Sequence, residues 1–252
     1  MLCPRTFKQV PLSANRASCA LLLFFQLALL ISTSSVLAAE PEPRIIHGNL
    51  VTATNIPTAR LIITTDTMSA LCSSVVLSPN VLISAAHCFA GIGSVLSITV
   101  LASDGTKAYG LAYSVDPLND LSYVRLDRNL SKQIKPAKVS SVAPRRGEDF
   151  LVLGYGQDDL GIPGHLISGT MKMYAAYGGI MVLVSAPGGT IVCHGDSGGP
   201  AFLFRKGKPY LVGIASVGEA TCTQGLAGYT SVLSASAKRF LKAALKKPKQ
   251  RQ

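Results

Sequence analysis

The sequence predicts an all-β protein, and three observations support this fold class. Ten short apolar runs recur along the chain, bounded by Gly, Pro, Asn or Asp, the residues that form turns. Glycine is frequent, with 23 residues among 252, and only one segment has a helical pattern. With 48% hydrophobic and 15% charged residues, the chain can bury a sizeable core.

The ten runs fall into two series of predicted strands. The first series covers residues 61–65, 74–77, 81–84, 96–101 and 109–115. The second covers residues 150–154, 169–174, 181–184, 200–204 and 211–216. Between them lies a polar, basic stretch with two prolines, residues 132–147. We expect this stretch to be the crossing between two β units.

The single predicted helix lies close to the C-terminus. Ser234 is placed to cap it, and four apolar residues share one face among lysines: Phe240, Leu241, Ala244 and Leu245. The chain ends in the basic sequence KKPKQRQ, and residues 45–252 carry a formal net charge of +9. Such a tail serves either solubility or attraction to an anionic surface, and composition alone does not separate the two.

Residues 1–39 have the layout of a secretory signal peptide. A basic start is followed by an apolar run at 20–31 and by small residues at 36–38. The alternative is an uncleaved anchor, because residues 20–39 are just long enough to span a bilayer. The Ser-Thr-Ser-Ser break at 32–35 argues against an anchor. We therefore expect a secreted or periplasmic protein without a stable membrane span after processing.

Four cysteines remain once this leader is removed. An even number in an exported chain predicts disulfides. The four are Cys72, Cys88, Cys193 and Cys222. They lack the C-x-x-C spacing of zinc ligands and the four histidines do not cluster, so no metal or other cofactor is expected.

Three short motifs contain residues suited to nucleophilic catalysis. SAAHC at 84–88 places His87 after a predicted strand, and NDLSYVRLD at 119–127 places Asp120 at the head of another. CHGDSGGP at 193–200 places Ser197 between an acid and two glycines. Each motif alone is weak evidence, since Gly, Asp, Ser and Pro are common in ordinary turns.

Together, in the order His, Asp, Ser, the motifs resemble the chymotrypsin/trypsin-like serine proteases. The resemblance extends from Arg44 to about Leu245. It implies two antiparallel six-stranded β-barrels with the active site between them and a C-terminal α-helix. The first barrel is expected at about 45–136, the second at about 137–233, and the helix and basic tail at 234–252. It also implies that Cys72 pairs with Cys88, and Cys193 with Cys222.

The resemblance assigns a catalytic role to each motif residue. Ser197 is expected to be the nucleophile, His87 the general base and then acid, and Asp120 the carboxylate that orients the histidine. Asp116 and Asp127 are nearby alternatives, but only Asp120 has the family's Asn-Asp-Leu setting. The backbone N–H groups of Gly195 and Ser197 are expected to form the oxyanion hole.

The sequence RIIHG at 44–48 resembles the family's activation site. Cleavage after Arg44 would free the α-amino group of Ile45 to pair with Asp196, and residues 40–44 would be a short pro-segment. The alternative is that Arg44 is only part of a linker.

The expected specificity pocket differs from that of the trypsin-like members. Ile191, followed by Val192, stands where those members carry an aspartate at the pocket base. The remaining expected lining residues are Ser216, Val217, Gly218 and Gly228. Burying a substrate Lys or Arg against Ile191 would be costly, so we expect an apolar residue, aliphatic or aromatic, before the scissile bond. Glu219 near the rim could attract a basic group instead.

The sequence thus predicts an exported serine endopeptidase, made as a zymogen and acting as a monomer on protein or peptide substrates. No specific nucleic-acid partner is expected. A separate, basic-specific protease is expected to cut Arg44–Ile45. Two alternatives are an inactive basic binding protein on the same scaffold and an esterase that uses the same residues. The chain also departs from the family pattern in Ser73-Ser74, where two glycines are common, and in Tyr155, where tryptophan is frequent.

Overall fold

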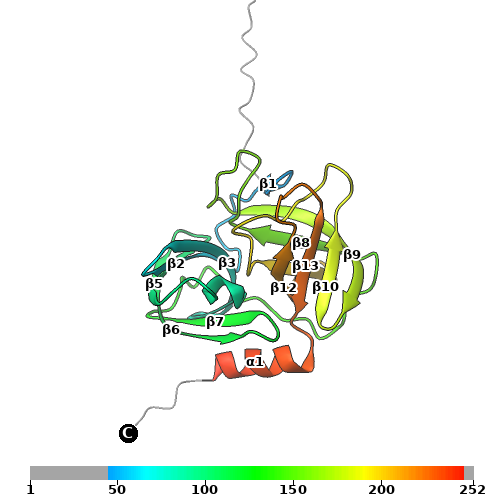
Figure 1. Cartoon of the computed structure of the whole chain (residues 1–252). Helices are drawn as coiled ribbons and strands as arrows, with labels where there is room; N and C mark the ends of the chain where they lie inside the picture. The colour runs from blue at the N-terminus through cyan, green and yellow to red at the C-terminus, as the bar shows by residue number, and fades with distance from the viewer. Residues whose placement is uncertain (1–44, 247–252) are drawn as a thin grey trace, which may run out of the picture. The chain divides into compact units, whose positions relative to one another are not determined.

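The computed structural model describes residues 45–246, which fold into two β-barrels and a C-terminal helix, α1 (Figure 1). Nearly all regular structure in this range is β-strand, as the sequence predicts. The predicted leader, the pro-segment and the tail from residue 247 onward lie outside the described residues.

The first barrel closes from six antiparallel strands in the order β2-β3-β4-β7-β6-β5. The strands are β2 (Thr58–Thr65), β3 (Ser69–Ser78), β4 (Val81–Ser84), β5 (Val95–Ala102), β6 (Lys107–Asp116) and β7 (Leu121–Leu126). Leu61 and Ile63 alternate along β2 and are fully buried, because successive side chains of a strand face opposite sides. Leu82, Val100 and Val124 fill the same core.

The second barrel also closes from six antiparallel strands, because β8 pairs with both β11 and β9. Its strands are β8 (Asp149–Gly154), β9 (Ile167–Tyr177), β10 (Ile180–Val184), β11 (Pro200–Arg205), β12 (Lys208–Gly218) and β13 (Leu226–Ser231). A seventh strand, β1 (Asn49–Leu50), pairs with β9 outside the closed ring. Phe150, Met171, Leu183 and Tyr229 fill the interior. The two predicted six-stranded barrels are therefore confirmed.

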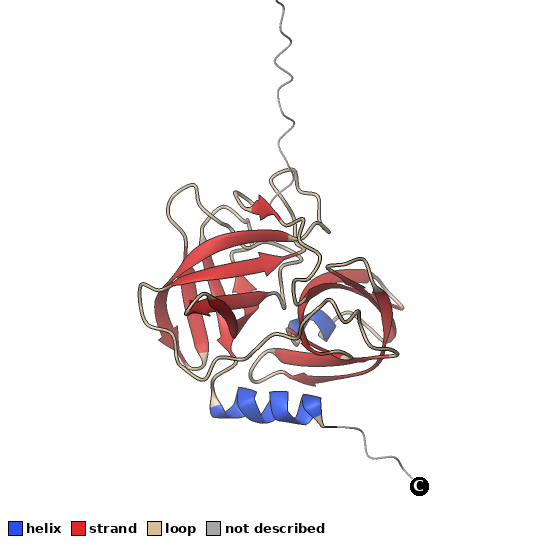
Figure 2. Ribbon diagram, turned by 180° about the vertical axis from the view of Figure 1, so that it is seen from behind, coloured by secondary structure: helices blue, strands red, loops and turns tan. Residues whose placement is uncertain are grey.

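An apolar cluster packs the two barrels against each other. Val75, Ile83 and Leu121 from the first barrel belong to the same buried cluster as Phe202 and Ile214 from the second. Figure 2 shows the two barrels from behind, with the helix along one side of the pair. This packing fixes the distance between side chains that come from different barrels.

Helix α1 (Ala235–Leu245) begins at the predicted cap. The Ser234 hydroxyl accepts a hydrogen bond from the backbone N–H of Ala237 at 3.1 Å, which satisfies one of the free donors of the first turn. Of the predicted apolar face, Leu241 and Ala244 are buried and Phe240 is half-buried, whereas Leu245, in the last turn, is 49% exposed.

Candidate active site

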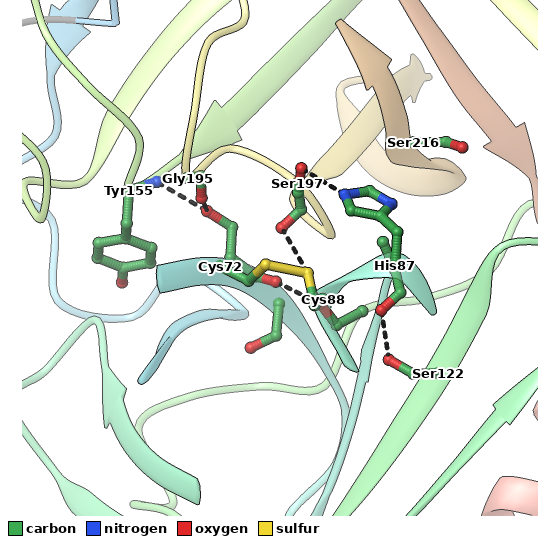
Figure 3. The surroundings of a disulfide bond; sticks show 12 residues. Cys72, His87, Cys88, Ser122, Tyr155, Gly195, Ser197 and Ser216 are labelled. Atoms are coloured by element: carbon green, nitrogen blue, oxygen red, sulfur yellow. Dashed lines mark hydrogen bonds between the residues drawn. A yellow bond between two sulfur atoms is a disulfide. The ribbon is translucent and has the colours of Figure 1, made fainter. Parts of the chain in front are cut away.

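His87 begins a short 3-10 helix, η1 (His87–Phe89), directly after strand β4 and two buried alanines. Its backbone N–H donates to Asp120 Oδ1 at 2.8 Å, and its Nδ1 lies 2.8 Å from Asp120 Oδ2. On the other side of the ring, Nε2 lies 2.7 Å from the hydroxyl oxygen of Ser197. Figure 3 shows the imidazole between the disulfide Cys72–Cys88 and Ser216, with its bond to Ser197 dashed. The imidazole is thus held at both nitrogens.

Asp120 ends the turn before β7 with φ at +47°, which turns its carboxylate toward His87. The Ser216 hydroxyl donates to Asp120 Oδ2 at 2.6 Å, a third hydrogen bond besides the two from His87. Partial burial raises the pKa of Asp120, but the hydrogen bonds from His87 and Ser216 outweigh it and leave the pKa below its ordinary value. The group is therefore an ionised acceptor near neutral pH.

The two alternative aspartates are engaged elsewhere. Asp116 accepts a hydrogen bond from the side-chain amide of Asn119 at 2.6 Å. Asp127 pairs with the guanidinium of Arg128 at 2.6 Å. Of the three candidates, the structure brings only Asp120 to His87.

Ser197 lies in the loop from Cys193 to Pro200, which two glycines shape. Gly195 and Gly198 have φ values of +97° and +84°, in the region where other residues are strained. A Cβ on Gly195 would lie 2.8 Å from the Cα of Gly156. The N–H groups of Asp196, Gly198 and Gly199 donate to backbone carbonyls. Among the described residues, those of Gly195 and Ser197 have no acceptor, so both stay available to a substrate oxygen.

Asp196 is buried behind this loop and is 2% exposed. Its carboxylate accepts hydrogen bonds from the backbone N–H groups of Gly156 at 2.8 Å and Cys193 at 2.9 Å. Burial nevertheless raises the pKa of Asp196 to about 7. Ile45 is also buried, at 1% exposed, and its backbone forms a β-bridge with Asp158. Asp196 thus has hydrogen-bond donors but no cationic partner among the described side chains.

Two disulfides frame the site, with the pairs expected from the resemblance. Cys72–Cys88 joins β3 to η1, with 6.4 Å between the Cα atoms, and holds the histidine turn. Cys193–Cys222 joins the Ser197 loop to the loop after β12, with 5.3 Å between the Cα atoms.

The structure brings only part of the expected specificity pocket together. Val192, Ser216, Val217 and Gly218 line a small cavity of about 20 Å³ next to Ser197. This space is close to the minimum that a single water needs. Ile191 does not line it: the residue is 6% exposed, and its N–H donates to the carbonyl of Ile46.

Gly228 does not line this cavity but a neighbouring groove, which shares Val217 and Gly218 with it and is also lined by Ile180 and Leu226. Strand pairing explains this position, because Gly228 is opposite Val217 in the β12–β13 ladder. The carboxylate of Glu219 accepts hydrogen bonds from the Thr221 hydroxyl and from the backbone N–H groups of Thr223 and Gln224, which lower its pKa to about 2. Glu219 therefore stays ionised and exposed at this rim, so the sequence expectation that it could attract a basic group stays open.

A second hollow lies beside the histidine. It has a volume of about 250 Å³, and its walls are the apolar residues Ala86, Phe89, Val115 and Pro117, next to His87 and Asp120. Because the wall is carbon, this hollow suits an apolar side chain.

Sequence reasoning missed the role of two serines. Ser216 was expected only to line the substrate path, but its side chain also fixes Asp120. Ser73 lies at the centre of the loop contacts, with its hydroxyl 2.8 Å from the carbonyl oxygen of Gly195. The only sequence signal for Ser73 is that serine stands where a glycine is common.

Comparison with known proteins identifies similar sequences. The family model described as Trypsin matches residues 45–238. A trypsin-like protease of Streptomyces glaucescens is 30% identical over 69% of this chain and 74% of its own length. Human kallikrein-4 is 30% identical over 64% of this chain and 73% of its own length. Trypsin alpha of Drosophila melanogaster is 28% identical over 72% and 80%, respectively.

Solved structures share the fold at lower sequence identity. A structure described as HL collagenase has a TM-score of 0.68 at 19% identity and covers 81% of this chain and all of that one. Neuropsin, a serine protease of mouse brain, has a TM-score of 0.63 at 20% identity and covers 80% of this chain and all of that one.

Within residues 45–246 no helix has the length and apolar character to cross a membrane. The same range has no group of three or more His, Cys, Asp or Glu side chains that could hold a metal ion.

Proposed function

Because this chain belongs to the trypsin family of serine proteases, which are hydrolases, we propose that it is an exported endopeptidase with Ser197, His87 and Asp120 as its catalytic triad. The observation that carries the proposal is the unbroken chain of hydrogen bonds between these residues. It measures 2.8 Å from Asp120 to His87 and 2.7 Å from His87 to Ser197. Such distances allow a proton to leave the serine as it attacks.

In the proposed reaction, His87 Nε2 takes the proton of the Ser197 hydroxyl as the oxygen attacks the scissile carbonyl. A tetrahedral intermediate forms, and its negative oxygen accepts hydrogen bonds from the N–H groups of Gly195 and Ser197. His87 then gives the proton to the leaving amine, and an acyl-enzyme remains on Ser197. Water, activated by the same histidine, releases the acid and restores the serine. Asp120 keeps Nδ1 protonated and stabilises the imidazolium throughout.

We propose that the protein is made as a zymogen that is activated by cleavage of Arg44–Ile45. Support comes from the buried Asp196, whose raised pKa reflects a carboxylate without a countercharge. The α-ammonium group of Ile45 would supply that charge, and Ile45 already lies buried in the second half of the molecule, where Ile46 bonds Ile191. A separate protease is expected to make this cut.

We further propose a preference for small aliphatic residues before the scissile bond. The cavity at Val192 and Gly218 is small and its described lining contains no charged side chain. An arginine or lysine would lose its hydration there without gaining a partner. The apolar hollow beside His87 would accept a second apolar side chain of the substrate.

Export through the predicted signal peptide is part of the same proposal. Two disulfides in the described residues are consistent with an oxidising compartment. Protein or peptide substrates follow from the protease family.

A serine-directed phosphonate tests the triad directly. We expect it to label protein that begins at Ile45, and to label neither the Ser197→Ala nor the His87→Ala variant. Both variants should unfold at the wild-type temperature, since each removes side-chain atoms next to solvent. Failure of the folded wild-type protein to react would refute the triad and favour the inactive binding protein.

A further inference from the structure

Ser73 joins the first barrel to the loop that carries the nucleophile. It lies in β3 directly after Cys72 and is fully buried. Its hydroxyl donates to the carbonyl oxygen of Gly195 at 2.8 Å and accepts from the backbone N–H of Tyr155 at 2.8 Å. A hydroxyl can donate and accept at once, so a single side chain satisfies two buried backbone groups of the second barrel.

The backbone of Ser73 makes two more contacts at the same place. Its N–H donates to the carbonyl oxygen of Ser197 at 2.8 Å. Its carbonyl accepts from the Ser84 hydroxyl at 2.7 Å, and a Cβ on Gly198 would lie 2.3 Å from that carbonyl oxygen. Ser73 therefore holds the carbonyl groups of both residues whose N–H groups form the proposed oxyanion hole.

Gly195 needs such an anchor, because glycine alone restricts its backbone very little. Its φ of +97° is one of several conformations that it can adopt. Fixing the carbonyl of Gly195 fixes the peptide plane between Gly195 and Asp196, and with it the ψ angle of Gly195. Figure 3 shows Tyr155 and Gly195 close together, next to Cys72.

We propose that Ser73 is a positioning residue that keeps the oxyanion hole ordered through its side-chain hydroxyl. Glycine, which is common at this position in the family, cannot make the two side-chain bonds. This chain thus has an anchor from the first barrel in addition to Asp196, which binds the loop from within the second. The inference rests on the proposed function, because it concerns the geometry of that same hole.

The test compares Ser73→Ala and Ser73→Gly with Ser74→Ala. Ser74 is a matched control: it is the next residue of β3, equally buried, and its hydroxyl donates to Ala59 at 2.8 Å, away from the loop. We expect both Ser73 variants to lower kcat on a peptide substrate about tenfold and to keep KM within about twofold of the wild-type value. The reason is that the hydrogen bonds of the hydroxyl to Gly195 and Tyr155 are both lost. Ser74→Ala should keep kcat within about twofold.

A second readout separates positioning from loss of stability. The pH at which activity falls on the alkaline side should be about one pH unit lower in the Ser73 variants than in the wild type. Without the Ser73 hydroxyl, the Gly195 loop is held mainly by the Ile45–Asp196 pair, which is lost when the α-amino group of Ile45 is deprotonated. Ser74→Ala should keep the wild-type pH profile. If Ser74→Ala lowers kcat as much as Ser73→Ala, or if the Ser73 variants keep wild-type kcat and pH profile, the inference is wrong.

The two proposals fail in different ways. A wild-type protein that does not react with the phosphonate refutes the triad. A wild-type protein that reacts, with Ser73 variants that turn over at the same rate, refutes only the role of Ser73. Ser73→Gly is a second variant in case the alanine variant does not fold, since glycine is the residue that is common at this position in the family.

Discussion

Replacing Asp196 with asparagine tests the activation pair most directly. The carboxyl is buried, and burial raises its pKa from 3.8 to about 7. At 1.36 kcal/mol per pH unit, holding it ionised in this place costs about 4 kcal/mol. In the proposed active form, the Ile45 ammonium offsets this cost, and the pair in turn holds the Gly195 loop. Asparagine removes the charge that attracts the ammonium.

We expect Asp196→Asn to lower kcat/KM at pH 7 by at least a hundredfold. The scale of the loss is set by that cost, because a pair that offsets about 4 kcal/mol corresponds to about three powers of ten in an equilibrium constant. The amide also turns an NH₂ group toward one of two backbone N–H donors, from Gly156 or Cys193, which adds to the loss. The assay is hydrolysis of a peptide reporter by protein whose N-terminus is verified as Ile45.

Asp149→Asn serves as the control, because the Asp149 carboxylate is 63% exposed and forms an ion pair with Lys172 on the surface. It should retain activity within about twofold. Thermal unfolding of both variants shows whether the fold persists. If folded Asp196→Asn retains more than a tenth of the wild-type kcat/KM, Asp196 does not act as the partner of the new N-terminus.

Four other outcomes follow from the same geometry. An α-amino group titrates near 8 when free and pairing raises its pKa, so on the alkaline side activity should persist past pH 8 and fall only through the raised pKa; a profile that has not fallen by pH 10.5 would contradict the pairing of Ile45. Ser216→Ala should lower kcat about tenfold with little change in KM, because the carboxylate of Asp120 loses one hydrogen bond, and an unchanged kcat would exclude this role. Reporters with Ala or Val before the scissile bond should be cut at least tenfold faster than those with Arg or Lys, and the reverse order would refute the proposed preference. Replacing Cys72 and Cys88 with alanine opens a loop of 16 residues and should lower the free energy of unfolding by about 3 kcal/mol. The measured Tm should fall by roughly 6–12 °C, and an unchanged Tm would show that the disulfide does not stabilise the fold.

Much of the fold could be predicted because strand signals in this chain are local. All ten predicted runs lie within observed strands, and the Ser234 cap begins the helix. The strands extend beyond the predictions at their ends, where the burial alternation fades. In β9 the predicted run ends at Tyr174, but the strand continues through Ala175 and Ala176 to Tyr177, which are half-buried or exposed and carry no alternating pattern.

The candidate site was predictable where a sequence motif identifies the residue. It was less predictable where the position of a side chain depends on residues that are distant in the sequence. The residues His87, Asp120 and Ser197 were named from motifs, and the structure brings them together. Ile191 was expected at the base of a pocket, but which side of its loop faces the cavity depends on packing against Ile46. Gly228 was assigned to the pocket by counting residues along the sequence. Its position in the structure is set by the pairing of β13 with β12, in which Gly228 lies opposite Val217.

Helix α1 has a mechanical consequence for the two halves of the enzyme. The helix continues from the last strand of the second barrel, yet Arg125 on β7 of the first barrel donates to the carbonyl groups of Ala243 and Lys246. Phe240 packs on Tyr123 of the same strand, with ring centroids 5.5 Å apart. The described polypeptide therefore crosses between the barrels three times: after β1, which pairs with β9, between β7 and β8, and at α1. The last crossing ties the end of the chain to the first barrel. We expect a chain that ends before Ser234 to lose these contacts and to hold His87 opposite Ser197 less firmly, and the helix, added back as a peptide, should restore part of the lost activity.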